Sequence, residues 1–245
     1  MKNYFSVLFS LLAVFLLLSC EGDGTKPVWD QTLDLWLADW SQDTIYRIDS
    51  ESGEVRESFP SPGSEPQGLA FNSGYLWNVD SATNTLYKLN PDNGNVVASF
   101  VLPWESPQGL ACNETNLWIS DDDTDMIYKV DMQTGSEVKT IPAPGTWITG
   151  LAWDGTHLWC SDAAASKIYK INPYNGEIIT QFNSPGILPM DLAWDGSHLW
   201  CVDSNDDKIY MLNPLDGSVI SDIATPYGAP TGLATQMEEF GPPPL

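Results

Sequence analysis

Basic residues are scarce in this chain. Ten lysine and arginine residues stand against 33 aspartate and glutamate residues, and the formal net charge is −23 at pH 7. Nucleic-acid binding needs basic side chains that displace the counterions of phosphates, so this charge argues against a nucleic-acid partner. The acidity does not indicate disorder, because 42% of the residues are hydrophobic and 11 are tryptophan. A length of 245 residues suits one large all-β domain or two small ones.

Groups that commonly carry enzyme chemistry are also few. The chain has two histidines, His157 and His198, no Gly-x-Ser-x-Gly motif and no glycine-rich phosphate loop. Nucleophilic catalysis of the serine–histidine type therefore finds no support, and we expect no catalytic residue of that kind. His157 and Cys160 resemble a metal pair, but on an alternating strand they face opposite sides and cannot share a metal. Three cysteines are expected to be free thiols: Cys112, Cys160 and Cys201.

No unit of the chain holds an apolar stripe of helical period, which excludes helical solenoids. A 41-residue repeat is present instead. Its Leu-Trp dipeptide places tryptophan at Trp36, Trp77, Trp118, Trp159 and Trp200. An aspartate follows three residues later each time, at Asp39, Asp80, Asp121, Asp162 and Asp203. The segment Gly-Leu-Ala opens most units, and glycine is replaced by Asp191 in one of them.

Each unit reads as four short strands separated by turn residues, which is typical of a β-propeller blade. Four complete units cover 68–108, 109–149, 150–190 and 191–231. The segment before residue 68 supplies strands two to four of a further blade, and the segment from Gly232 supplies its missing first strand. The sequence therefore predicts an all-β, five-bladed β-propeller over 31–236, closed by a blade that both chain ends share. A short proline-rich tail covers 237–245.

The first 30 residues have a different composition. Residues 1–19 read as a secretory signal, with a short basic start and an apolar run that is short for a membrane span. Leu17 to Cys20 resembles a bacterial lipobox, which implies cleavage before Cys20 and lipidation of its thiol. Residues 20–30 would then be the lipidated cysteine and a polar tether. The alternative is an uncleaved anchor helix. The expected location is the bacterial cell envelope, facing the periplasm or the outer membrane, with membrane contact only through the lipid.

The repeat resembles the propellers of the NHL, YWTD and streptogramin-lyase-like group, on motifs such as Leu158 to Asp162. It more weakly resembles the plant-type glutaminyl cyclase (glutamine cyclotransferase) family, through "PQGL" at 66–69 and 107–110. The second resemblance implies an acidic catalytic residue after "QGL", where this chain has Ala70 and Ala111. The first implies a histidine base at the channel mouth, whereas both histidines flank hairpins of the opposite face.

Two acidic features raise the question of Ca²⁺. The recurring aspartates could form a ring of ligands, but each also ends a strand, where it can accept backbone N–H bonds of the next turn. We favour the turn role. The loop 121–125 ("DDDTD") lacks the glycine of an EF-hand and reads as a solvated charge run. We expect no cofactor, with modest Ca²⁺ binding left open as the alternative.

Ligand binding is expected where the blades differ. The proline-rich return loops and the second-to-third-strand loops should share one face, at the mouth of the channel. The unrepeated aromatic residues of that face are Trp40, Trp104, Trp147 and Tyr227. The residues expected to rim the channel are Gln67, Gln108, Thr149, Met190 and Thr231. Asp191 places a single acid near the axis and is a further candidate contact. The alternative for the aromatic residues is local packing of the loops.

These features favour a lipid-anchored, non-enzymatic propeller that binds a ligand or partner through its loop-rich face. The partner would be an extracellular or periplasmic protein, peptide or glycan. The alternative is a propeller enzyme of the glutaminyl-peptide cyclotransferase or lyase/lactonase type. A purely structural surface module is a third hypothesis.

Overall fold

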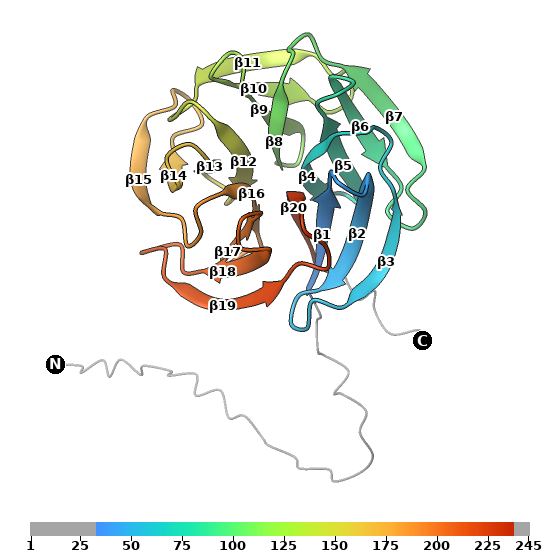
Figure 1. The fold of residues 1–245 in the computed structure, drawn as a ribbon. Coiled ribbons are helices and arrows are strands. Elements are labelled where there is room, and N and C mark those ends of the chain that lie inside the picture. The colour runs from blue at the N-terminus through green and yellow to red at the C-terminus, as the bar shows by residue number, and fades with distance from the viewer. Residues whose placement is uncertain (1–32, 238–245) are drawn as a thin grey trace, which may run out of the picture. The chain divides into compact units, whose positions relative to one another are not determined.

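The computed structural model describes residues 33–237, which form five four-stranded antiparallel sheets around a common axis (Figure 1). The innermost strands are β20 (Pro230–Met237), β4 (Pro66–Asn72), β8 (Pro107–Cys112), β12 (Ile148–Trp153) and β16 (Pro189–Trp194). The second strands are β1 (Leu33–Asp39), β5 (Tyr75–Asp80), β9 (Asn116–Asp121), β13 (Leu158–Asp162) and β17 (Leu199–Asp203). The predicted five-bladed propeller is confirmed.

The two outer positions of each sheet are filled in chain order. The third strands are β2 (Thr44–Asp49), β6 (Thr85–Leu89), β10 (Met126–Asp131), β14 (Lys167–Ile171) and β18 (Lys208–Leu212). The outermost strands are β3 (Val55–Pro60), β7 (Val96–Val101), β11 (Glu137–Pro142), β15 (Ile178–Asn183) and β19 (Val219–Ala224). Within residues 33–237 no helix could span a bilayer. We name the blades A to E by their second strands: β1, β5, β9, β13 and β17.

Blade A closes the ring in the predicted way. Its sheet order is β20-β1-β2-β3, and β20 pairs with β1 from Leu33↔Met237 to Asp39↔Pro230. The strand that follows blade E in the chain therefore becomes the inner strand of the blade that begins the propeller. This pairing removes two free inner edges, which would otherwise offer unpaired backbone groups to other chains.

The repeated tryptophans lie between blades. Five hydrophobic clusters occupy the five blade interfaces, and each contains the Leu-Trp tryptophan of one blade and leucines of the next. Trp159 of blade D, for example, is 1% exposed and packs with Leu192 and Leu199 of blade E. Burying a tryptophan removes about 150–250 Å² of its surface from water, so these side chains are the main apolar contacts between blades.

The repeated aspartates have the turn role that we favoured. In every blade the Oδ1 atom of this aspartate accepts backbone N–H bonds from the following loop, as Asp121 does from Thr124 at 3.0 Å. In three blades Oδ2 also accepts an N–H from the proline-rich return loop, such as that of Ser106 at 2.9 Å. Each of these three aspartates thus joins two loops of its blade.

Candidate ligand-binding site

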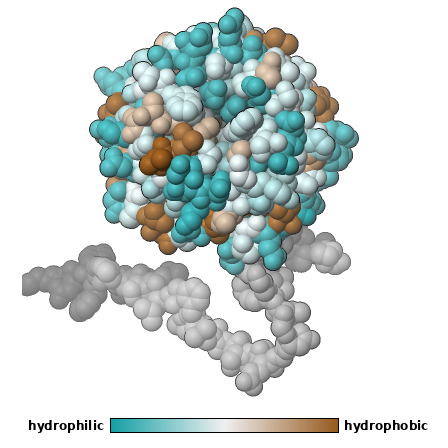
Figure 2. Space-filling model, in the orientation of Figure 1, coloured by the Kyte–Doolittle hydropathy of each residue, from teal (hydrophilic) through white to brown (hydrophobic). Residues whose placement is uncertain are grey.

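Two faces of the propeller differ in the loops that they carry. The loop face holds the proline-rich returns and the second-to-third-strand loops. The returns are 61–65, 102–106, 143–147, 184–188 and 225–229. The hairpin face holds the connections from each innermost strand to the second strand. The face seen in Figure 2 is mainly hydrophilic, with hydrophobic residues in small separate groups. That face therefore offers no broad apolar surface for a partner.

A cavity of about 390 Å³ opens on the loop face. Six residues predicted to bind ligand line it: Trp40, Gln67, Gln108, Trp147, Met190 and Thr231. Five further lining residues are Glu65, Ser81, Glu105, Ser106 and Asp122. Together the eleven lining residues come from all five blades, so the cavity is assembled from the whole ring. A site of this kind depends on the loops that break the five-fold symmetry.

The two tryptophans of the cavity are open to ligand. Trp40 is 53% exposed and Trp147 is 36% exposed, although indole rings are mostly buried in proteins. Trp40 follows the last residue of β1, and its backbone N–H is held by the carbonyl of Ala229 at 3.3 Å. Trp147 directly precedes β12, and its carbonyl accepts the N–H of Ala163 at 3.1 Å. Ordered backbone beneath both rings lowers the entropy cost of using them in binding.

The polar lining of the cavity is acidic. Glu65, Glu105 and Asp122 contribute carboxylates, and among residues 33–237 no lysine, arginine or histidine lines the cavity. Burial and the neighbouring Asp125, then Asp121 and Asp123, raise the pKa of Asp122 above its usual value. Like charges are thus held close together, and no basic side chain of the described part of the chain pairs with them. A cation entering the cavity would relieve this repulsion.

Trp104 and Tyr227 lie outside the cavity. Trp104 is only 8% exposed, and its ring stacks on Tyr128 with 3.9 Å between centroids. The local-packing alternative therefore describes Trp104, because its return loop turns the ring inward over blade C. Tyr227 is 47% exposed, and its ring lies 4.9 Å from that of Tyr46.

Two threonines predicted at the rim hold neighbouring innermost strands together. Thr149 is 2% exposed and donates its Oγ1 hydrogen to the carbonyl of Pro189 at 2.7 Å. Thr231 is 3% exposed and donates to the carbonyl of Pro66 at 2.6 Å. Thr231 also lines the cavity, whereas Thr149 does not. Both hydroxyls are engaged within the ring.

Asp191 lies at the centre of the ring and has no exposed surface. Its Oδ1 accepts N–H bonds from Leu151 and Leu192 at 3.2 and 2.8 Å. Its Oδ2 accepts N–H bonds from Leu69 and Leu233 at 3.2 and 2.7 Å. Burial raises the pKa of Asp191 well above its usual range, and the four backbone donors oppose this rise. One side chain thus joins four of the five innermost strands.

The position of Asp191 is a glycine in each of the other four blades, because the axis has space for only one side chain. A Cβ on Gly150 would lie 2.3 Å from the Cα of Asp191, and one on Gly232 would lie 2.2 Å from the carbonyl oxygen of Gln67. Contacts under 3 Å do not occur between real Cβ atoms and backbone. Glycine therefore holds this position on the other four innermost strands, and Asp191 is the exception that the ring accommodates.

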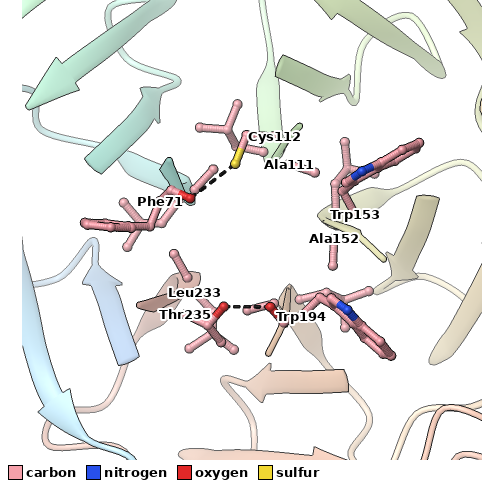
Figure 3. A pocket seen from close by; sticks show the side chains of 15 residues that line it. Phe71, Ala111, Cys112, Ala152, Trp153, Trp194, Leu233 and Thr235 are labelled. Carbon is pink, nitrogen blue, oxygen red and sulfur yellow. Dashed lines mark hydrogen bonds between the residues drawn. The ribbon is translucent and has the colours of Figure 1, made fainter. Parts of the chain in front are cut away.

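The channel has a second opening on the hairpin face, shown in Figure 3. It encloses about 130 Å³ and is lined by the last residues of the innermost strands, among them Phe71, Cys112 and Trp153. The thiol of Cys112 donates to the carbonyl of Phe71 at 3.4 Å, and burial raises its pKa to about 12. Cys160 and Cys201 are fully buried and also free. A thiol with a raised pKa is a poor nucleophile at neutral pH, as is typical of buried structural cysteines.

The histidines lie at hairpins of this second face. The ring of His157 is 3.7 Å from Asp154, and that of His198 is 3.3 Å from Asp195. Over the range that the structure describes, no three histidine, cysteine, aspartate or glutamate side chains gather as metal ligands would.

No protein-family model and no curated protein matches the chain. Among solved structures, a glutaminyl cyclase of Myxococcus xanthus is similar at 17% identity and a TM-score of 0.59, over 65% of this chain and 70% of that one. A chain of a nidogen/laminin complex is similar at 13% identity and a TM-score of 0.60, over 83% and 98%. Virginiamycin B lyase of Staphylococcus aureus matches at 19% identity and a TM-score of 0.52, over 83% and 73%. These likenesses confirm the propeller resemblance and show the fold alone.

Proposed function

We propose that this protein is an exported, lipid-anchored propeller that binds a positively charged peptide segment in the loop-face cavity. The observation that carries the proposal is the lining of that cavity, in which exposed indole rings stand beside carboxylates that have no basic partner within residues 33–237. Ammonium and guanidinium groups bind over indole faces with about 0.5–2 kcal/mol. Carboxylates add charge-assisted hydrogen bonds, which are roughly twice as strong as neutral ones.

The geometry favours binding over a cyclotransferase-type reaction. The acid nearest the axis is Asp191, and both of its oxygens accept backbone hydrogen bonds inside the ring. A general acid or base must reach the proton that it transfers. Asp191 is fully buried in this arrangement, so we assign it to the support of the ring.

Replacing both cavity tryptophans is expected to weaken recognition strongly. On an array of lysine- and arginine-containing peptides, Trp40→Ala with Trp147→Ala should weaken binding at least about tenfold, which corresponds to about 1.4 kcal/mol. Tyr227→Ala is the matched control, since Tyr227 is an exposed aromatic residue of the same face that does not line the cavity. Equal binding by the double variant and the wild type would contradict the proposal.

The lipid anchor is proposed from Leu17 to Cys20, which lie outside the described residues. Several acyl chains on one cysteine give stable anchoring, whereas one chain is marginal. The wild-type protein from bacterial cells should therefore partition into the detergent phase of Triton X-114, and Cys20→Ser should move it to the aqueous phase. Detergent partitioning by both proteins would instead support an uncleaved anchor helix.

A further inference from the structure

A second cavity lies between blades C and D and is separate from the loop-face cavity. It measures about 280 Å³. Its lining residues are Asn113, Trp118, Lys129, Val138, Lys139, Trp153, Pro173 and Tyr174. They come from β9 to β12, from the turn between β8 and β9, and from the turn between β14 and β15 of blade D. No acidic residue is among them, although the protein carries a net charge of −23. This local composition points to a bound anion.

The indole N–H of Trp118 has no acceptor. Trp118 is 2% exposed, and its Nε1 atom is buried without a hydrogen-bond partner within the described residues. The equivalent indoles of three other blades do have one. Trp159 Nε1 donates to Asp154 Oδ2 at 3.1 Å and Trp200 Nε1 to Asp195 Oδ2 at 2.8 Å, while Trp36 Nε1 donates to Gln236. Leaving a buried donor without an acceptor costs free energy. The difference between Trp118 and the other indoles therefore needs a physical explanation.

Trp118 lacks an acceptor because one residue of the repeat differs in blade C. Asn113 occupies the position that Asp154 holds 41 residues later, and both cap their turns in the same way. Asn113 Oδ1 accepts the N–H of Asn116 at 2.8 Å, as Asp154 Oδ1 accepts that of His157 at 2.7 Å. The cap takes the only side-chain oxygen of Asn113, which leaves its Nδ2 donors for the other side. The blade C site thus has donors where blade D has a carboxylate oxygen.

Two lysines add to this excess of donors. Lys129 and Lys139 are directly opposite each other on β10 and β11, an arrangement in which like charges are destabilising. Neither forms an ion pair within residues 33–237, and their Nζ atoms lie over Trp118 and Tyr174 at 5.3 and 5.4 Å. The corresponding lysine of blade D, Lys170, is neutralised by Asp154 at 2.7 Å.

We propose that this cavity binds a small organic carboxylate, which supplies the oxygens that Asp154 supplies in blade D. One carboxylate would accept hydrogen bonds from Trp118 and Asn113 and neutralise the lysine pair. Trp153 and Tyr174 offer aromatic surface for an apolar or sugar body, and Tyr174 is 76% exposed. Because the Trp118 Nε1 atom is buried in this structure, side chains that line the cavity have to shift as the carboxylate enters. Aromatic acids and sugar acids share this chemistry.

The test uses the folded protein and defined probes. Isothermal titration calorimetry with phenylacetate and with glucuronate shows whether the cavity binds aromatic acids or sugar acids. Phenylacetamide is the neutral control. We expect saturable binding of at least one acid in the roughly millimolar range and none of the amide. Asn113→Asp should weaken this binding at least about tenfold, because its carboxylate takes the ligand's place and repels it. The same variant should unfold at a higher temperature than the wild type, since Trp118 and Lys129 gain their missing partner.

Matched lysine variants separate this site from general charge effects. Lys129→Gln and Lys139→Gln should each weaken binding, whereas Lys88→Gln should leave it unchanged. Lys88 holds the position of Lys129 in blade B and lies 5.5 Å over Trp77, but it does not line the cavity. The proposal is overturned if neither acid saturates, if the amide binds as well as the acids, or if Asn113→Asp binds as tightly as the wild type. None of these outcomes concerns the loop-face cavity, so the two proposals fail independently.

Discussion

A chain shortened to end at Ala229 is expected to lose its cooperative unfolding transition. The deletion removes β20, which pairs with β1 along its length and fills the inner position of blade A. It takes away the buried Leu233 and Ala234 and exposes the edge of β1. The net stability of a folded domain is only about 5–15 kcal/mol, and the loss of an inner strand is expected to exceed it.

Thermal unfolding followed by circular dichroism tests this expectation. The control is a chain shortened to end at Met237, which keeps every pair between β20 and β1. The control should unfold cooperatively, and the longer deletion should show no transition. A cooperative transition of similar midpoint in both proteins would contradict closure through blade A.

Replacing Asp191 is expected to have the second-largest effect. Asp191→Gly returns the position to the residue found in the other blades, and it removes the acceptor of four buried N–H groups. Each unsatisfied buried donor costs about 1–3 kcal/mol, so the loss should be roughly 4 kcal/mol or more. Asp191→Asn keeps the volume and one acceptor oxygen, and it should cost about half as much.

Chemical denaturation of the three proteins measures this series. The order of stability should be wild type, then Asp191→Asn, then Asp191→Gly, with little change in the denaturant slope. Stabilities of both variants within about 0.5 kcal/mol of the wild type would show that Asp191 does not support the ring.

The fold could be predicted because its physical cause repeats along the chain. The interface tryptophan recurs five times at the same spacing, glycine holds four of the five crowded inner positions, and no insertion interrupts the repeat between Trp36 and Gly232. Closure followed from counting strands, since the first unit lacks an inner strand and the last segment supplies one. Local turn chemistry and global packing agree in this protein, which is why the periodic pattern suffices.

The candidate site was only partly predictable. Its face followed from the strand direction, and six of the residues expected there do line the cavity. The inward turn of Trp104 depends on the shape of its loop and on Tyr128, which no spacing reveals. Glu65 and Glu105 were missed, although each lies two or three residues before a rim glutamine. Asp122 was interpreted as a solvated charge, whereas it lines the cavity.

The blade C anion site was missed for a different reason. The hairpin signal "WDG" of blades D and E is "CNE" in blade C, which reads as ordinary variation in a turn. Only the hydrogen-bond pattern shows that aspartate at this position also serves the tryptophan of its own blade. A substitution inside a repeat is therefore informative once the partner of the repeated residue is known.

Fluorine NMR of protein labelled with 5-fluorotryptophan tests the central claim most directly. The claim is that the loop-face cavity binds a positively charged peptide group through Trp40 and Trp147. Titration with Nα-acetyl-arginine amide should shift two resonances, assigned by their loss in Trp40→Phe and Trp147→Phe, in a saturable way, while the other resonances stay in place. No shift of these two resonances at saturating ligand, or equal shifts with the uncharged Nα-acetyl-glutamine amide, would contradict the claim.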